Sequence, residues 1–176
     1  MAIQTRPREV GAPCCRSTGA HTACDTQRME TQVEYLHLQS GGDPPVLTIS
    51  GPLKAVVVVN DAVEAEWREV VSDWLVRSRC LYMMAWGRDC SLWDDSVDHA
   101  VRKKFNFAPI PEEQFVMTTW HEHDSLEQVF WYSQFCAYDP HTDLLHTLIL
   151  DIGPVERRSE FLKLFEQSST LAEREP

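Results

Sequence analysis

The 176-residue chain lacks the signatures of several common activities. It contains neither a G-x-G-x-x-G dinucleotide fingerprint nor a G-x-x-x-x-G-K-[ST] phosphate-binding loop. It has only seven glycines, and none of them cluster at a predicted strand-to-helix turn, which argues against a loop that cradles phosphate. No G-x-S-x-G nucleophile elbow occurs either. The sequence therefore shows no recognised catalytic motif, and we assign it no cofactor.

Long hydrophobic runs are also missing, since no apolar stretch approaches the ~20 residues of a membrane span. The amino-terminal residues lack the apolar core of a secretory signal. Six cysteines are present but no C-x-x-C, and three of the six fall within the first 28 residues. We therefore expect reduced thiols in a cytoplasmic protein that has no association with membranes.

Positive charge is scarce, with 16 Lys and Arg against 27 Asp and Glu, for a net charge of −11. Residues 1–28 carry four Arg against two acids, so the rest of the chain is near −13. Such a surface repels phosphate backbones, which disfavours nucleic acid as a partner. It suits a basic protein partner, or serves only to keep the protein in solution. The sequence specifies no oligomeric state.

The composition divides the chain into four parts. Residues 1–28 have hardly any large apolar side chains, and we interpret them as a disordered leader or as sequence upstream of a true start at Met29. Residues 29–45 are a linker with a short strand over residues 33–38. Residues 46–168 are expected to form a single α/β domain, followed by a tail over residues 169–176.

Apolar runs alternate with amphipathic segments along this domain. The predicted strands are residues 46–50, 53–60, 80–86, 114–120 and 144–152. The predicted helices are about residues 61–79, 92–104, 124–135 and 155–167, with caps at Asn60 or Asp61, at Ser91 with Asp94, and at Asp124 with Glu127. Strands and helices that alternate with short loops predict a small three-layer α/β domain. Its sheet is mostly parallel, with four to five strands, Rossmann-like or flavodoxin-like.

Polar residues follow each predicted strand, and ligands of open α/β sheets bind at the carboxyl ends of the strands. The candidate cleft consists of Asp89, Cys90, Asp95, Asp98, Trp120 and His121. Neighbouring polar strand ends are Asn60, Asp61 and Asp151. Acids at helix starts also have a purely structural explanation, because they favour the helix dipole. The sequence leaves both explanations open.

Two groups in this region have recognisable chemistry. Cys90 precedes a helix, which lowers a thiol pKa, but neighbouring acids raise it, so a packing cysteine is the alternative to a nucleophile. His121 and His123 have the i, i+2 spacing of metal ligands on a strand. Asp124 directly follows His123 and no further histidine comes next, which fits known metallohydrolase patterns poorly. We assign no metal site.

Two segments resemble a bacterial protein family of unknown function: AWGRDC at residues 85–90 and MTTWHEHDSLE at residues 117–127. The resemblance covers roughly residues 50–168. It implies a single small α/β domain in a bacterial cytoplasm and implies no particular activity.

Two kinds of function are compatible with these features. The first is a non-enzymatic acidic binding or accessory protein of the immunity type. The second is a small-ligand sensor, or an enzyme of the hydrolase or transferase type, whose acidic cleft includes Asp89, Cys90, Asp94, Asp98 and His121.

Overall fold

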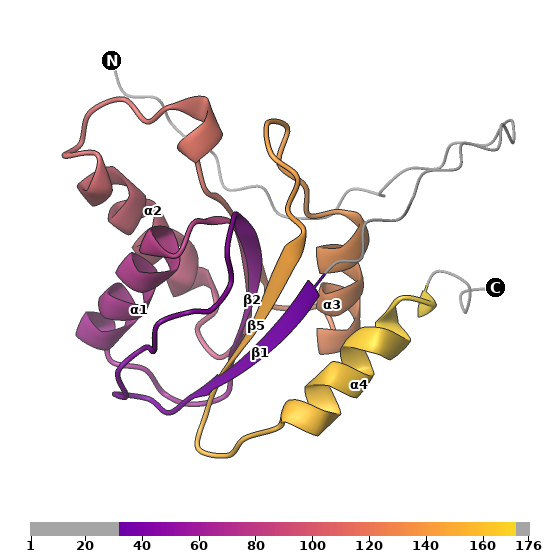
Figure 1. Ribbon diagram of the computed structural model, residues 1–176. Helices are drawn as coiled ribbons and strands as arrows, with labels where there is room; N and C mark the ends of the chain where they lie inside the picture. The colour runs from indigo at the N-terminus through magenta and orange to yellow at the C-terminus, as the bar shows by residue number, and fades with distance from the viewer. Residues whose placement is uncertain (1–31, 172–176) are drawn as a thin grey trace, which may run out of the picture.

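The computed structural model describes residues 32–171 and shows one parallel sheet with helices on both faces (Figure 1). The strands are β1 (Gln32–Leu38), β2 (Leu53–Val59), β3 (Cys80–Gly87), β4 (Met117–His121) and β5 (His146–Ile152). The helices are α1 (Ala65–Arg77), α2 (Ser91–Lys104), α3 (Leu126–Phe135) and α4 (Arg158–Ser168), with a 3-10 turn at Glu112–Gln114. This confirms the predicted three-layer α/β fold. The predicted leader and the last five residues lie outside the described residues.

The strands lie in the order β1-β5-β2-β3-β4, and every neighbouring pair is parallel. Helices α1 and α2 cover one face of the sheet and α3 and α4 cover the other (Figure 1). The chain leaves β2 toward α1 on the first face and leaves β5 toward α4 on the second. The strand order therefore reverses between β2 and β5, where doubly wound folds open a crevice.

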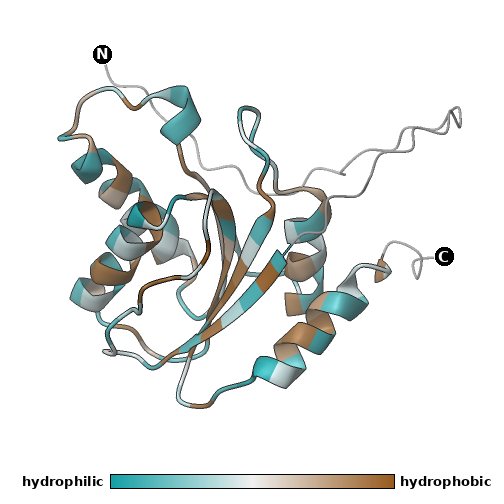
Figure 2. Ribbon diagram, viewed as in Figure 1, coloured by the Kyte–Doolittle hydropathy of each residue, from teal (hydrophilic) through white to brown (hydrophobic). Residues whose placement is uncertain are grey.

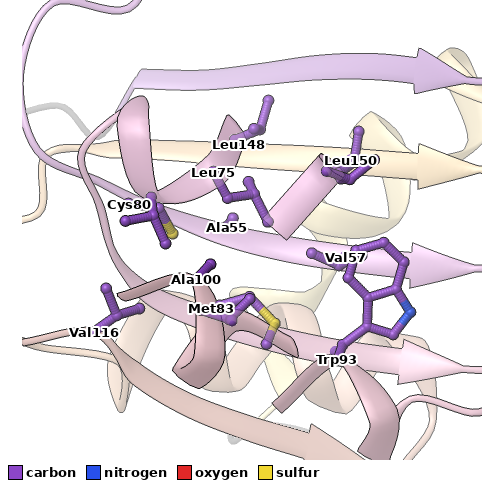
Figure 3. Close-up of a cluster of buried hydrophobic side chains, with 14 of the residues drawn as sticks. Ala55, Val57, Leu75, Cys80, Met83, Trp93, Ala100, Val116, Leu148 and Leu150 are labelled. Atoms are coloured by element: carbon purple, nitrogen blue, oxygen red, sulfur yellow. The ribbon is translucent and has the colours of Figure 1, made fainter. Parts of the chain in front are cut away.

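The sheet is buried on both faces, as the apolar strands predict. All seven residues of β2 are buried, and alternate side chains of β2, β3 and β5 enter two separate cores. Figure 3 shows the core beneath α1 and α2, where Leu75 and Trp93 pack over Val57 and Met83. Hydrophobic colour in Figure 2 follows the strands and the inner helix faces, while the outer faces are mostly hydrophilic.

Strand β1 is an edge strand of this same sheet, so the described domain extends back to Gln32 rather than beginning at residue 46. The strand predicted over residues 46–50 is wrong. That segment has no strand pairing and instead covers the sheet as a loop, with Leu47 and Ile49 against the core. The indole nitrogens of Trp67 and Trp74 donate to the carbonyls of Gly42 and Pro45, both at 2.7 Å, and hold the loop in place.

The helix caps were predicted at the wrong residues. Helix α1 begins at Ala65, well after Asn60 and Asp61. Helix α2 has Cys90 at its N-cap and no side-chain cap, so Ser91 and Asp94 form no capping box. The capping box of α3 is formed by Ser125 and Gln128, one residue beyond the predicted pair. Other ends differ too: β4 starts at Met117 because a 3-10 turn occupies the preceding residues, and α4 starts at Arg158.

Candidate functional site at the carboxyl edge of the sheet

The turn that joins β3 to α2 has a fixed conformation. Gly87 has φ of +97°, and a side chain there would collide with the Val59 carbonyl oxygen. That same carbonyl accepts a hydrogen bond from the Arg88 N–H at 2.9 Å. Asp89 then takes up φ of +50°, which is unusual for a residue other than glycine, and its side chain is exposed. The turn therefore presents Asp89 to solvent at the sheet edge.

Cys90 follows that turn and lies inside the protein, only 2% exposed. Burial raises the pKa of its thiol, and the nearby negative charge of Glu122 adds to the increase, although a hydrogen bond with the His121 backbone opposes it. A neutral, buried thiol is a poor nucleophile. Cys90 instead connects the β3–α2 turn to the end of β4. Cys80 is also a buried, unbridged thiol, at the opposite end of β3.

His121 is the last residue of β4 and is 3% exposed. Its Nδ1 lies 2.7 Å from Asp124 Oδ2, and its Nε2 lies 3.1 Å from Thr119 Oγ1. In a neutral imidazole, donation from Nδ1 to the carboxylate leaves Nε2 to accept from the threonine hydroxyl. The Trp86 indole also donates to the Asp124 backbone carbonyl at 2.8 Å. Aspartate, histidine and hydroxyl therefore form one chain of hydrogen bonds that runs inward from the partly exposed Asp124 to the buried His121 and Thr119.

This chain of hydrogen bonds is enclosed by two tyrosines. The His121 ring packs edge-on against Tyr132 of α3 at 5.1 Å between centroids, and the Tyr132 hydroxyl lies 2.9 Å from that of Tyr82. Burial, and then the hydrogen bond with Tyr132, raises the pKa of Tyr82 above its usual range. The Tyr82 phenol is therefore neutral at physiological pH, and the two hydroxyls form a hydrogen-bonded pair.

Acidic side chains lie outside this enclosed network, on the first turns of α2. Asp95 is exposed, whereas Asp94 and Asp98 are half-buried. Burial, and then the negative charge of Asp94, raises the pKa of Asp98 above its usual range. Arg102, whose guanidinium lies 3.8 Å from the Asp98 carboxylate at the surface, opposes this increase. The acids of α2 therefore repel one another in the free protein.

Two tryptophans lie near this edge. Trp93 is fully buried, and the half-buried Trp120 of the candidate cleft packs against the core beneath α1 and α2. Two hollows lie at the opposite edge of the sheet, by the amino ends of the strands. One is lined by Gln32, Glu34, Thr48 and His146, and the other by Arg79, Lys104, Glu113 and Thr142. The structure thus brings Cys90 and His121 together in the interior and leaves Asp89 and Asp95 outside on an acidic surface.

A second polar cluster occupies the point where the strand order reverses. Asp151 of β5 is 0% exposed, and its carboxylate accepts from Arg157 at 2.6 Å and from the Tyr35 hydroxyl at 2.7 Å. Asn60 donates to the same carboxylate at 3.4 Å. Burial, and then the hydrogen bond to Asp151, raises the pKa of Tyr35 above its usual range. His37 completes the cluster at 2.8 Å from the Gly153 carbonyl oxygen.

Sequence reasoning found Asp151 and Asn60 but missed Tyr35, His37 and Arg157. Tyr35 and His37 fall in the short strand predicted over residues 33–38, but that strand was assigned to a linker outside the domain. Arg157 was placed inside a helix that begins one residue later. Only the pairing of β1 with β5 brings the two β1 residues to Asp151.

No three His, Cys, Asp or Glu side chains among residues 32–171 come together as a metal-binding group. The i, i+2 argument for His121 and His123 fails because β4 ends at the first of them, which is turned inward. Within the same residues, no helix is both long and apolar enough to cross a bilayer.

The fold and its polar edge define a small, doubly wound α/β domain. The chain belongs to the family described as a domain of unknown function, DUF7684, which matches residues 33–168. This confirms membership in a family of unknown function. No curated protein and no solved structure matches the chain.

Proposed function

We propose that this protein is a non-enzymatic binding or accessory protein, of the immunity type, that engages a basic protein partner in a bacterial cytoplasm. The acidic surface next to the carboxyl ends of β3 and β4 is the contact region. It includes Asp89, Asp95 and Glu122, all of which are exposed.

The uneven distribution of Lys and Arg residues along the chain is the main support for this proposal. Residues 105–156, which form β4, α3 and β5, contain nine acidic residues and neither Lys nor Arg. The acids on α2 add to this field, where burial, and then repulsion by Asp94, raises the pKa of Asp98. A cationic partner removes that repulsion on binding, and it is also attracted at long range.

The state of the reactive groups supports the same proposal. Cys90 is a buried, neutral thiol, Asp151 is saturated by internal donors, and His121 has both nitrogens occupied. Each of these groups stabilises contacts between loops or strands. The exposed side chains around them include the carboxylates of Asp89, Asp95 and Glu122, with Arg88 as a neighbouring cation.

Affinity capture from a bacterial lysate tests the proposal, with the full chain as bait at about 50 mM and about 500 mM salt. We expect a basic protein that is retained only at the lower salt concentration. Asp95→Lys with Glu122→Lys should abolish its retention. The matched control, Glu66→Lys with Glu69→Lys on the exposed face of α1, changes the charge equally and should not. Equal retention by both double variants, or no basic partner, contradicts the proposal.

A hydrolase or transferase is the second candidate, because Asp124, His121 and Thr119 occur in the order of a catalytic triad at 2.7 Å and 3.1 Å. Against it, the Thr119 hydroxyl belongs to a residue only 9% exposed, so substrate has little access. A fluorophosphonate probe separates the two candidates. Covalent labelling of Thr119 that is lost in His121→Ala supports an enzyme, and an unlabelled protein supports the binding function.

A further inference from the structure

We infer that the outer edge of β4 is the docking site for an extended segment of the partner, which pairs with β4 as a sixth strand. The segment carries alternating apolar residues and then Lys or Arg. This inference rests on the proposed function and names the surface and the chemistry of the partner.

The two edges of the sheet are protected differently. Outer edges of sheets are normally blunted by charged side chains, proline or a covering loop. On β1, Glu34 contributes a charge and accepts a hydrogen bond from Thr48 of the covering loop. Strand β4, with the sequence MTTWH, contains no Lys, Arg, Asp, Glu or proline and pairs with β3 alone. Its five residues offer about 17 Å of edge to an incoming strand.

Apolar side chains are accessible on β4 itself and on the outer face of α3, the helix whose Tyr132 packs against His121 of β4. Met117 is 40% exposed and lies in register with Tyr82, whose hydroxyl meets Tyr132 of α3. Phe135, one turn along α3 from Tyr132, is 44% exposed and packs against Trp131 with ring centroids 5.6 Å apart. We call Met117, Trp131 and Phe135 the β4 edge surface. Alternate apolar side chains of an added strand would cover it.

The charges near the two ends of β4 determine in which direction the partner segment runs along the strand. At the carboxyl end are Glu122, which is exposed, and the half-buried Asp124. At the amino end Glu113 lines a hollow with Arg79 and Lys104, so the acids there already have cations nearby. The Lys or Arg residues of the partner therefore belong at the carboxyl end, beside Glu122, and its apolar residues beside Met117.

A second copy of this chain fits the same edge less well. A paired copy would bring only acids and histidines to Glu122 and Asp124 from its own β4 and α3, and the Arg79 and Lys104 at its amino end already lie beside its own Glu113. Like charges across an interface disfavour association. A separate, cationic segment is the occupant that complements both the apolar surface and the charge.

The probe is the capped peptide Val-Thr-Val-Thr-Val-Lys-Lys, titrated into the isotopically labelled full chain and followed by NMR. We expect amide shifts confined to β4 and the carboxyl-terminal half of α3. Two further peptides are N-methylated on either the odd or the even residues. Since only one edge of an added strand faces β4, one of these two should lose binding and the other should keep it.

Two double variants locate the apolar contact. Met117→Lys with Phe135→Lys should weaken peptide binding at least tenfold. Val46→Lys with Val155→Lys places the same charges at exposed apolar positions off this edge, and binding should stay within twofold. All four side chains are at least 40% exposed, so folding should be preserved, and circular dichroism verifies this.

The outcomes separate this inference from the proposed function. Equal binding by both N-methylated peptides, or shifts that map elsewhere, overturns strand addition and leaves the acidic binding function standing. Absence of binding by any of these basic peptides at low salt counts against both. Concentration-dependent dimerisation through β4 in sedimentation experiments, without peptide, overturns the assigned occupant.

Discussion

Two carboxylates at the same edge of the sheet, Asp151 and Asp124, are used in opposite ways. Asp151 is 0% exposed and is held by an arginine and a tyrosine, whereas the Asp124 side chain is 41% exposed and is held by one histidine. The first lies between neighbouring strands on both sides, and the second follows an edge strand. Position in the sheet therefore divides the carboxyl edge into a closed half, whose carboxylate is buried and fully paired, and an open half, whose carboxylate is partly exposed to solvent.

The closed half should be the more sensitive to mutation. Asp151→Asn leaves the Arg157 guanidinium and the Tyr35 hydroxyl without their anionic acceptor. We expect a loss of about 3 kcal/mol from the free energy of unfolding at neutral pH, the lower end for a broken buried pair because Arg157 is partly exposed. Urea unfolding followed by tryptophan fluorescence measures this loss.

The matched substitution in the open half is Asp124→Asn. It removes the charge from a hydrogen bond that water can partly replace, so we expect a loss of about 1 kcal/mol in the same assay. Equal losses for the two substitutions would show that the division of the edge into closed and open halves is wrong.

A substitution at Asp98 tests how much its burial and the neighbouring negative charge lower the stability of the folded protein. Its pKa is higher in the folded chain than its ordinary value of 3.8, so the folded protein binds this proton more tightly than the unfolded chain does. The free energy of unfolding consequently falls as pH rises from 3.8 through the raised pKa. Asp98→Asn removes this fall, and its stability relative to wild type should increase across the same window. A relative stability that decreases with pH would mean that Arg102 outweighs burial.

The smallest effect is expected for Asp94→Ala. Asp94 makes no cap hydrogen bond, and its favourable interaction with the helix dipole is offset by repulsion of Asp98. The free energy of unfolding should change by less than about 0.5 kcal/mol, below the usual cost of a lost cap. A loss above about 1 kcal/mol in urea unfolding would indicate a capping contact.

The fold could be predicted because its strands are strongly patterned. Four consecutive valines in β2 and the apolar run of β3 are typical only of buried, parallel strands. Cap positions could not be predicted well, since Asn60 and Asp61 precede α1 by several residues and Asp124 and Ser125 are adjacent candidates before α3. The segment of residues 46–50 was misjudged because its apolar side chains pack on the sheet without joining it.

The sequence by itself determined the class of fold, the order of its elements, and the acidic, cation-poor character of the chain, because periodicity and charge are local properties. Tertiary structure alone decided which strand ends became neighbours. It placed β5 between β1 and β2, which closed Asp151 within a cluster, and it left β4 at the edge, which kept Glu122 and Met117 accessible. Strand order depends on how the crossovers pack against each other over long separations, and no local pattern of residues encodes that.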